Sequence, residues 1–262
     1  LPNLVKESMA ITKKEFEKVI DDLIKESVKF EISELRYKAH KNQIFNSLLL
    51  FNVEINRKSD AISEFYPFKQ HKDNQWSLEH IHARNSEDFD KNKKEQWTSW
   101  LNLHLPILKE IFARTSEEDK LLELGSIVTD VEKYNNDQIT WERFNALFER
   151  VNDVFTLDRE RLDSESEGLS NLALLSQPDN AALNNAVFEI KRREILRLDK
   201  EGSFIPVGTR RVFMKYYYDE GISTQHFFWS TSDRSSYFNA LRSALSTYLP
   251  KIYIAPEENE DE

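Results

Sequence analysis

Two short apolar runs constrain the fold of this chain more than any other feature. They are Trp76–Asn85 and Leu169–Asn180, and each combines strand-like apolar residues with polar or turn residues at its end. The stretch between them, from Ser86 to about Phe155, has helical periodicity instead. We therefore expect two strands that meet in space, with a helical insertion in the chain between them.

The rest of the chain is typical of a mostly helical protein, because it has only five glycines and seven prolines. Thr12 and Glu15 have capping-box spacing, and Thr140 is a candidate helix cap. The expected fold is α+β and mostly helical, with a small strand-strand-helix motif embedded in a helical domain. The expected segments are an N-terminal helical segment at 1–70, a site-bearing core at 71–218 with a helical insertion at about 86–160, a C-terminal strand and helix at 219–255, and a disordered acidic tail at 256–262.

The two apolar runs also carry the candidate catalytic and metal-binding residues. Glu79 and His80 are adjacent in the first run, and Asn180 follows the second run where a helix is expected to begin. A carboxylate and an amide oxygen are ligands for a hard divalent cation, and an imidazole beside them can act as a general base. Such a set is suited to breaking a phosphodiester bond. The histidines outside this run have no neighbouring acid of this kind and are interpreted as incidental: His40, His71, His104 and His226.

Composition excludes several classes of protein. The chain has no cysteine, which excludes disulfides, thiolate zinc sites and a cysteine nucleophile, and which suits a reducing cytoplasm. It has no apolar run of the ~18 residues that a membrane span needs, so no membrane association is expected. The net charge of −10 argues against nucleic-acid binding, but eight Lys or Arg face only four acids between Glu189 and Lys215.

The order of these residues resembles the ββα-metal fold of HNH endonucleases. That signature has an acid-His pair, an Asn, and a final His or Asn about nine residues later, which fall here on Glu79–His80, Asn171 and Asn180. The wider frame resembles the C-terminal nuclease domain of GmrSD-type restriction and phage-defence proteins, over roughly Lys41 to Tyr248. The segments that carry this likeness are Leu48–Asn52, Trp76–Ile81, Leu169–Leu175 and Phe188–Arg192.

The resemblance implies a role for each matched residue. His80 would be the general base, and Asn171 would hold the loop between the strands and orient His80. Glu79 and Asn180 would bind one Mg²⁺ or Mn²⁺ ion. Further along the helix, Lys191, Arg192 and Asn184 would contact the substrate, with the two basic residues gripping the phosphate backbone.

The resemblance further implies a DNA endonuclease that nicks or cleaves as the effector of a modification-dependent restriction or anti-phage system. In that family the nuclease follows a ParB-like nucleotide-hydrolysing domain with a Gln-Gln-Arg motif. The motif is absent here and the chain begins at Leu1, so we expect a fragment of a longer protein whose partner domain is missing.

Two departures from the family pattern leave alternatives open. Ala83 stands where many relatives have proline. His82, two residues after His80 on the expected strand, faces the same side and is a candidate second metal ligand or substrate contact. The alternatives to a DNA endonuclease are a non-catalytic DNA-binding or interaction module and an RNA-cleaving effector with the same chemistry.

Overall fold

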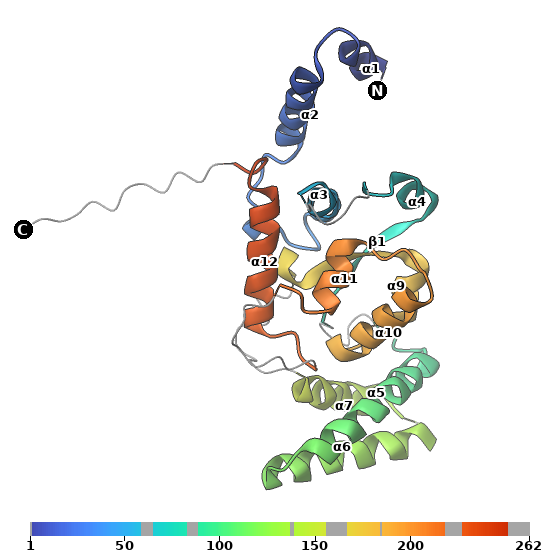
Figure 1. Cartoon of the computed structure of the whole chain (residues 1–262). Helices are drawn as coiled ribbons and strands as arrows, with labels where there is room; N and C mark the ends of the chain where they lie inside the picture. The colour runs from blue at the N-terminus through green and yellow to red at the C-terminus, as the bar shows by residue number, and fades with distance from the viewer. Residues whose placement is uncertain are drawn as a thin grey trace, which may run out of the picture.

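A computed structural model describes residues 2–58, 65–82, 89–136, 139–155, 167–183, 185–217 and 227–250. In these residues the protein is mostly helical with one two-stranded sheet, which confirms the expected mostly helical α+β class (Figure 1). Asn184 and the acidic tail at 256–262 lie outside the described residues. Among the described helices, none has both the length and the apolar character needed to cross a bilayer.

The elements follow one another with short connections in most places. The first part of the chain contains α1 (Pro2–Ser8), α2 (Lys13–Ser27), the 3-10 helix η1 (Ile32–Glu34), α3 (Lys41–Lys58), α4 (Phe68–Asp73) and β1 (Trp76–His80). Next come α5 (Lys94–Arg114), α6 (Glu118–Asn136) and α7 (Trp141–Val154). The last part contains η3 (Leu169–Asn171), β2 (Leu172–Ser176), α9 (Gln177–Leu183), α10 (Phe188–Lys200), α11 (Val207–Phe213) and α12 (Thr231–Leu245).

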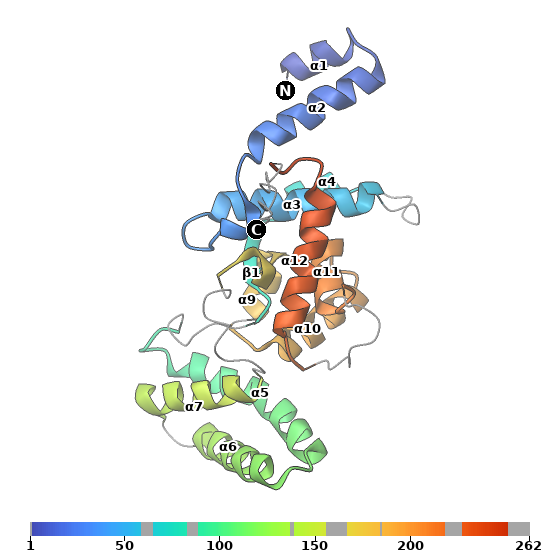
Figure 2. The same cartoon turned by 90° about the vertical axis from the view of Figure 1, so that its left-hand side faces the viewer.

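The two apolar runs pair as an antiparallel sheet of β1 and β2. Glu79 lies opposite Ala173, and His80 lies opposite Leu172. All five residues of β2 are buried, as expected for a continuous apolar run, whereas β1 is half-buried. Helices α3, α9 and α11 contact β2. Figures 1 and 2 show β1 between α3 and α9, with which it is in contact.

Two separate hydrophobic cores stabilise the molecule. The first core surrounds the sheet and joins α3, β2, α10, α11 and α12, with Phe51, Leu174 and Tyr237 almost fully buried. The second core lies among α5, α6 and α7, where Trp97 and Phe144 stack with ring centroids 5.5 Å apart. Each large apolar side chain contributes roughly 1.5–3 kcal/mol on burial. Helix α10 supplies residues to both cores, so it fixes the helical unit of α5–α7 against the sheet.

Local signals at two helix starts are confirmed. Thr12 forms the expected capping box with Glu15 at the start of α2, and the Thr140 side chain accepts a hydrogen bond from the Arg143 backbone N–H at the start of α7. Helices α1 and α2 project from the body of the molecule in both views (Figures 1 and 2).

The expected C-terminal strand is wrong for the residues that the structure describes. Residues 227–230 form no strand, and α12 follows them directly. The aromatic residues of this segment serve the cores instead: the Trp229 ring stacks on Phe188 with centroids 5.4 Å apart and meets Tyr237 edge-on. An apolar aromatic run therefore marks burial here rather than β structure.

Candidate active site at the end of the hairpin

The hairpin and the following helix bring Asn180 beside β1. The Ser176 hydroxyl accepts a hydrogen bond from the Asp179 backbone N–H and so caps α9 immediately after β2. Asn180 thus lies in the first turn of α9, where its Nδ2 donates to Ser77 Oγ at 2.9 Å. Ser77 and Glu79 are two residues apart on β1 and share one face of the strand. Asn180 and Glu79 therefore belong to the same side of the sheet.

Lys191 forms an ion pair with Glu79. Its Nζ lies 2.5 Å from Glu79 Oε1 and donates to the His80 backbone carbonyl at 2.6 Å. The Lys191 side chain is 1% exposed and that of Glu79 is 11% exposed, so this is a buried ion pair. The sequence-based role of Lys191 as a phosphate clamp is wrong in geometry, because a clamp needs an ammonium in contact with solvent.

The sequence contains a signal for the burial of Lys191. It lies three residues after Phe188 and four before Ile195, both of which are buried on α10. Residues at these spacings share one helix face. A lysine within an apolar helical stripe is therefore a signal for a buried cation that needs an acidic partner.

Asn171 binds the chain just beyond β1. Its Oδ1 accepts from the His82 backbone N–H at 3.1 Å, and its Nδ2 donates to the His82 carbonyl at 3.2 Å. Its own carbonyl accepts from the Ile81 N–H at 2.8 Å. This buried residue therefore fixes the backbone that leaves the strand immediately after His80.

His80 is the last residue of β1, and its side chain is only partly buried. The alternation of a strand directs it to the face opposite to that of Glu79. There its imidazole meets the Tyr37 ring edge-on, with centroids 4.7 Å apart. The hairpin thus holds the expected base and the expected metal ligands on neighbouring residues, but it directs them to different sides of the strand end.

His82 is buried beneath α10 and does not share a strand face with His80, because β1 ends before it. Its Nδ1 accepts from the Phe188 backbone N–H at 3.4 Å. The neighbouring N–H, of Val187, donates to His104 Nε2 at 3.2 Å, and His104 Nδ1 donates to the Trp100 carbonyl at 2.7 Å. Two imidazoles therefore accept the open N–H groups at the start of α10.

Burial keeps both histidines in the neutral form that this capping role needs. Burial lowers the pKa of His82 to about 3, with smaller contributions from the charges of Arg234 and Lys191. Burial likewise lowers the pKa of His104 to about 3. A neutral imidazole can accept an N–H bond, whereas a protonated one cannot. The expectation that His82 faces a metal beside His80 is wrong in geometry, and His104, interpreted as incidental, is part of the structure.

The three arginines of α10, Arg192, Arg193 and Arg197, are paired with acids of the same region. Arg192 donates to Glu189 through Nε at 2.6 Å and through Nη2 at 3.1 Å. Arg193 binds both Glu189 and Glu110, and Arg197 lies between Glu194 and Glu201. The expected phosphate contact of Arg192 would have to compete with a buried carboxylate. The local excess of Lys and Arg in the sequence is therefore largely neutralised within the fold.

The oxygen ligands near β1 fit a hard cation in kind. Glu79 offers a carboxylate, and Asn180, whose Nδ2 is bound to Ser77, retains its amide oxygen. Mg²⁺ is commonly held by one or two such protein oxygens together with water. Among the described residues, no group of three or more His, Cys, Asp or Glu is arranged to hold a metal ion. Because Lys191 already neutralises Glu79, metal affinity at this site is expected to be low.

Comparison with family models, with curated proteins and with solved structures found no match to this chain.

Proposed function

We propose that this protein is a metal-dependent DNA endonuclease of the HNH type, the effector of a modification-dependent restriction or anti-phage system. One observation carries the proposal: the β1–β2–α9 unit joins Asn180 to the strand that bears Glu79 and His80, through the hydrogen bond from Asn180 to Ser77. The sequence resemblance expects the same order of strand, strand and helix, which supports the proposal.

Each residue has a distinct part in the proposed reaction. The His80 imidazole would accept a proton from the attacking water, since imidazoles exchange protons with water near neutral pH. Asn171 fixes the backbone that follows the strand, and Lys191 fixes both the Glu79 carboxylate and the His80 carbonyl. Glu79 and Asn180 would hold the Mg²⁺ or Mn²⁺ ion, which supplies stabilisation of the charge that develops on the phosphate and the leaving oxygen.

The direct test is cleavage of supercoiled plasmid by the purified protein with Mg²⁺ or Mn²⁺. The His80→Ala variant is expected to lose cleavage, while His40→Gln, a matched histidine change in the turn before α3, keeps it. Equal cleavage by wild type and His80→Ala would contradict the assignment. An RNA of matched length in parallel reactions tests the RNA-cleaving alternative, which predicts faster loss of the RNA.

The Glu79–Lys191 ion pair favours a second candidate, a non-catalytic DNA-binding or interaction module. A carboxylate that is already neutralised has less charge to offer a cation. Calorimetric titration with Mn²⁺ separates the two candidates. A nuclease binds Mn²⁺ and loses that binding in Asn180→Ala, whereas the non-catalytic module gives no heat of binding in either protein.

A further inference from the structure

Two aromatic rings are exposed on the surface just before β1, where the chain leads into α4. Phe65 is 90% exposed and Phe68 is 51% exposed, although both are large apolar side chains. Each exposed ring forgoes the stabilisation that burial would give. Single exposed apolar residues are ordinary on a protein surface, but a group of them marks a binding surface. We call Phe65 and Phe68 together the aromatic platform.

The aromatic platform is fixed to β1 through a series of ring contacts. The Tyr66 ring is buried and meets Phe68 edge-on, with centroids 5.1 Å apart. Tyr66 Oη forms a hydrogen bond of 2.9 Å with His71 Nδ1, and the His71 ring stacks on Trp76 with centroids 4.9 Å apart. Trp76 Nε1 in turn donates to the His71 carbonyl at 2.6 Å. The platform therefore has a defined position relative to the first residue of β1.

The first residue of β1 and the proposed base lie on one face of the strand. Alternate residues of a strand point the same way, so Trp76 shares a face with His80, roughly 13 Å further along. Helix α3 lies beside α4 (Figures 1 and 2), and its Phe45 meets His71 with centroids 6.3 Å apart. Tyr37, which precedes α3, meets the His80 ring. The start of α3 therefore connects the platform to the proposed base.

Exposed lysines lie along this connection. Lys41, the first residue of α3, has its Nζ 4.8 Å from the centroid of the Tyr37 ring. Lys72 follows Phe68 by four residues on α4, so the two side chains share a helix face. Neither lysine forms an ion pair within the part of the chain that the structure describes, whereas the arginines of α10 are bound to acids. The one acid of α4 is Asp73, at its last position. These ammonium groups are therefore suited to phosphate contacts.

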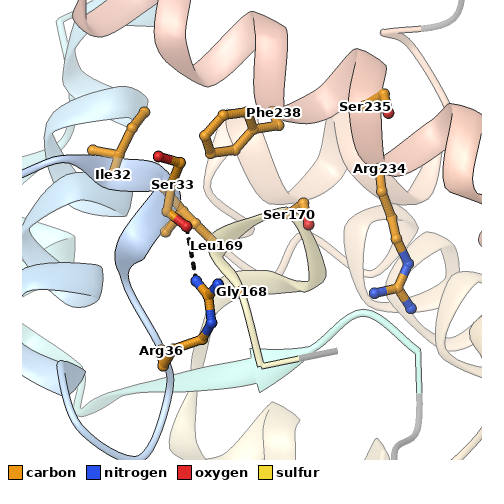
Figure 3. A pocket seen from close by; sticks show the side chains of 9 residues that line it. All are labelled: Ile32, Ser33, Arg36, Gly168, Leu169, Ser170, Arg234, Ser235 and Phe238. Atoms are coloured by element: carbon orange, nitrogen blue, oxygen red, sulfur yellow. Dashed lines mark hydrogen bonds between the residues drawn. The ribbon is translucent and has the colours of Figure 1, made fainter. Parts of the chain in front are cut away.

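The turn that carries Tyr37 is held by its own hydrogen bonds. Arg36 Nη1 donates to the Ser33 carbonyl at 2.8 Å (Figure 3). The Tyr37 backbone N–H donates to the Glu167 carbonyl at 2.9 Å. Tyr37 and the Lys41 ammonium over its ring are therefore in position before a ligand binds, which reduces the ordering cost of binding.

We propose that this surface binds a single-stranded stretch of the DNA substrate, with unpaired bases stacked on Phe65 and Phe68 and with phosphates at Lys72 and Lys41. The inference rests on the proposed nuclease function for the identity of the ligand. Proteins that bind single strands combine aromatic rings, on which bases stack, with cations that follow the backbone. The bases of a duplex are stacked on one another and so are not free to stack on the platform. The bound strand runs along the start of α3 to the phosphodiester bond at His80.

The test measures DNA binding without cleavage. Fluorescence anisotropy of a labelled single strand and of the matching duplex is recorded with the His80→Ala protein in EDTA, at several salt concentrations. In that background Phe65→Ala and Phe68→Ala are each expected to weaken single-strand binding about tenfold, with duplex binding and the salt slope unchanged. The matched control is Tyr216→Ala, at an exposed ring after α11, which is expected to change none of these.

The lysines give a separate readout. Lys41→Gln and Lys72→Gln are each expected to weaken single-strand binding and to reduce its salt slope by about 0.7, because each removes one phosphate contact on a single strand. Lys133→Gln on α6 is the matched control, since its ammonium also lies over a tyrosine ring, 5.6 Å from the centroid of Tyr134. This control is expected to leave the salt slope unchanged.

The outcomes separate this inference from the proposed function. Melting curves verify that each variant folds, and Phe65→Ala and Lys41→Gln carry the test if loss of the Phe68 ring disturbs Tyr66. Absent single-strand binding, equal affinity of the platform variants and Tyr216→Ala, or an equal loss of duplex binding would each overturn the inference while leaving plasmid cleavage by the wild type intact. Single-strand binding that depends on the platform, in a protein whose wild type never cleaves DNA, would instead contradict the proposed function.

Discussion

The Glu79–Lys191 ion pair offers the sharpest test of the site geometry. Lys191→Met keeps an unbranched side chain but removes the ammonium, so the buried Glu79 carboxylate and the His80 carbonyl lose the donor that Lys191 supplies. Removing one partner of a buried pair costs about 3–5 kcal/mol of unfolding free energy, whereas an exposed pair contributes at most about 1 kcal/mol. Because Lys191 is 1% exposed, the larger value is expected.

The assay is urea unfolding at pH 7, followed by tryptophan fluorescence and by far-ultraviolet circular dichroism. Coincident curves from the two probes verify that the two cores unfold together. Lys200→Met, an exposed lysine on the same helix, is the matched control and is expected to change stability by less than about 0.5 kcal/mol. In a double-mutant cycle, Glu79→Gln with Lys191→Met is expected to lose no more stability than either single change.

Two results would refute the reasoning. One is a Lys191→Met variant as stable as Lys200→Met, which would mean that the ammonium is not buried against Glu79. The other is strict additivity of the two single changes, which would mean that the side chains do not interact. The same variants test the metal hypothesis. Mn²⁺ is expected to stabilise Lys191→Met more than the wild type, because the Glu79 carboxylate is no longer paired with the Lys191 ammonium, and to leave the double variant unchanged.

Three further outcomes follow from particular contacts. Burial lowers the pKa values of His82 and His104 to about 3, so only the unfolded chain takes up protons at these residues between pH 6.5 and 3. The free energy of unfolding therefore falls as the pH drops through that window, by about 2 kcal/mol for each histidine at pH 5. Urea unfolding of His104→Gln should show half of this pH-dependent loss. Asn171→Ala removes the side-chain partners of the buried N–H and carbonyl of His82 and is expected to lower the free energy of unfolding by about 2–4 kcal/mol. Hydrogen exchange at residues 81 and 82 should become faster, and unchanged exchange there would contradict this role of Asn171. Gly208→Ala places a Cβ 2.9 Å from Phe51 Cε1 and 2.9 Å from the Asn52 oxygen that accepts a hydrogen bond from the Gly208 N–H. Thermal unfolding should therefore show a loss of about 1–3 kcal/mol in stability. An unchanged melting temperature would mean that α3 and α11 can move apart at low energetic cost.

The helical segment after the hairpin contains a break that the local sequence does not predict. The sequence predicts that a helix begins at Asn180, but the chain forms two helices here, α9 and α10, with a break between them. Asn185 adopts a left-handed φ of 48° in the break, and its carbonyl accepts a hydrogen bond from Trp100 Nε1 at 2.9 Å. The bond that stabilises the break comes from α5, so no window of sequence around Asn185 contains it.

The sequence by itself determined the mostly helical α+β class, the two strands and the caps at Thr12 and Thr140. These depend on periodicity and on hydrogen bonds between residues close in the chain, so they can be read locally. Only the tertiary structure decided that Lys191 neutralises Glu79 and that His82 and His104 cap α10. The reason is physical: the charge and hydrogen-bonding state of each of these side chains depends on burial against partners that are distant in sequence, and burial exists only once the helices have packed around the sheet.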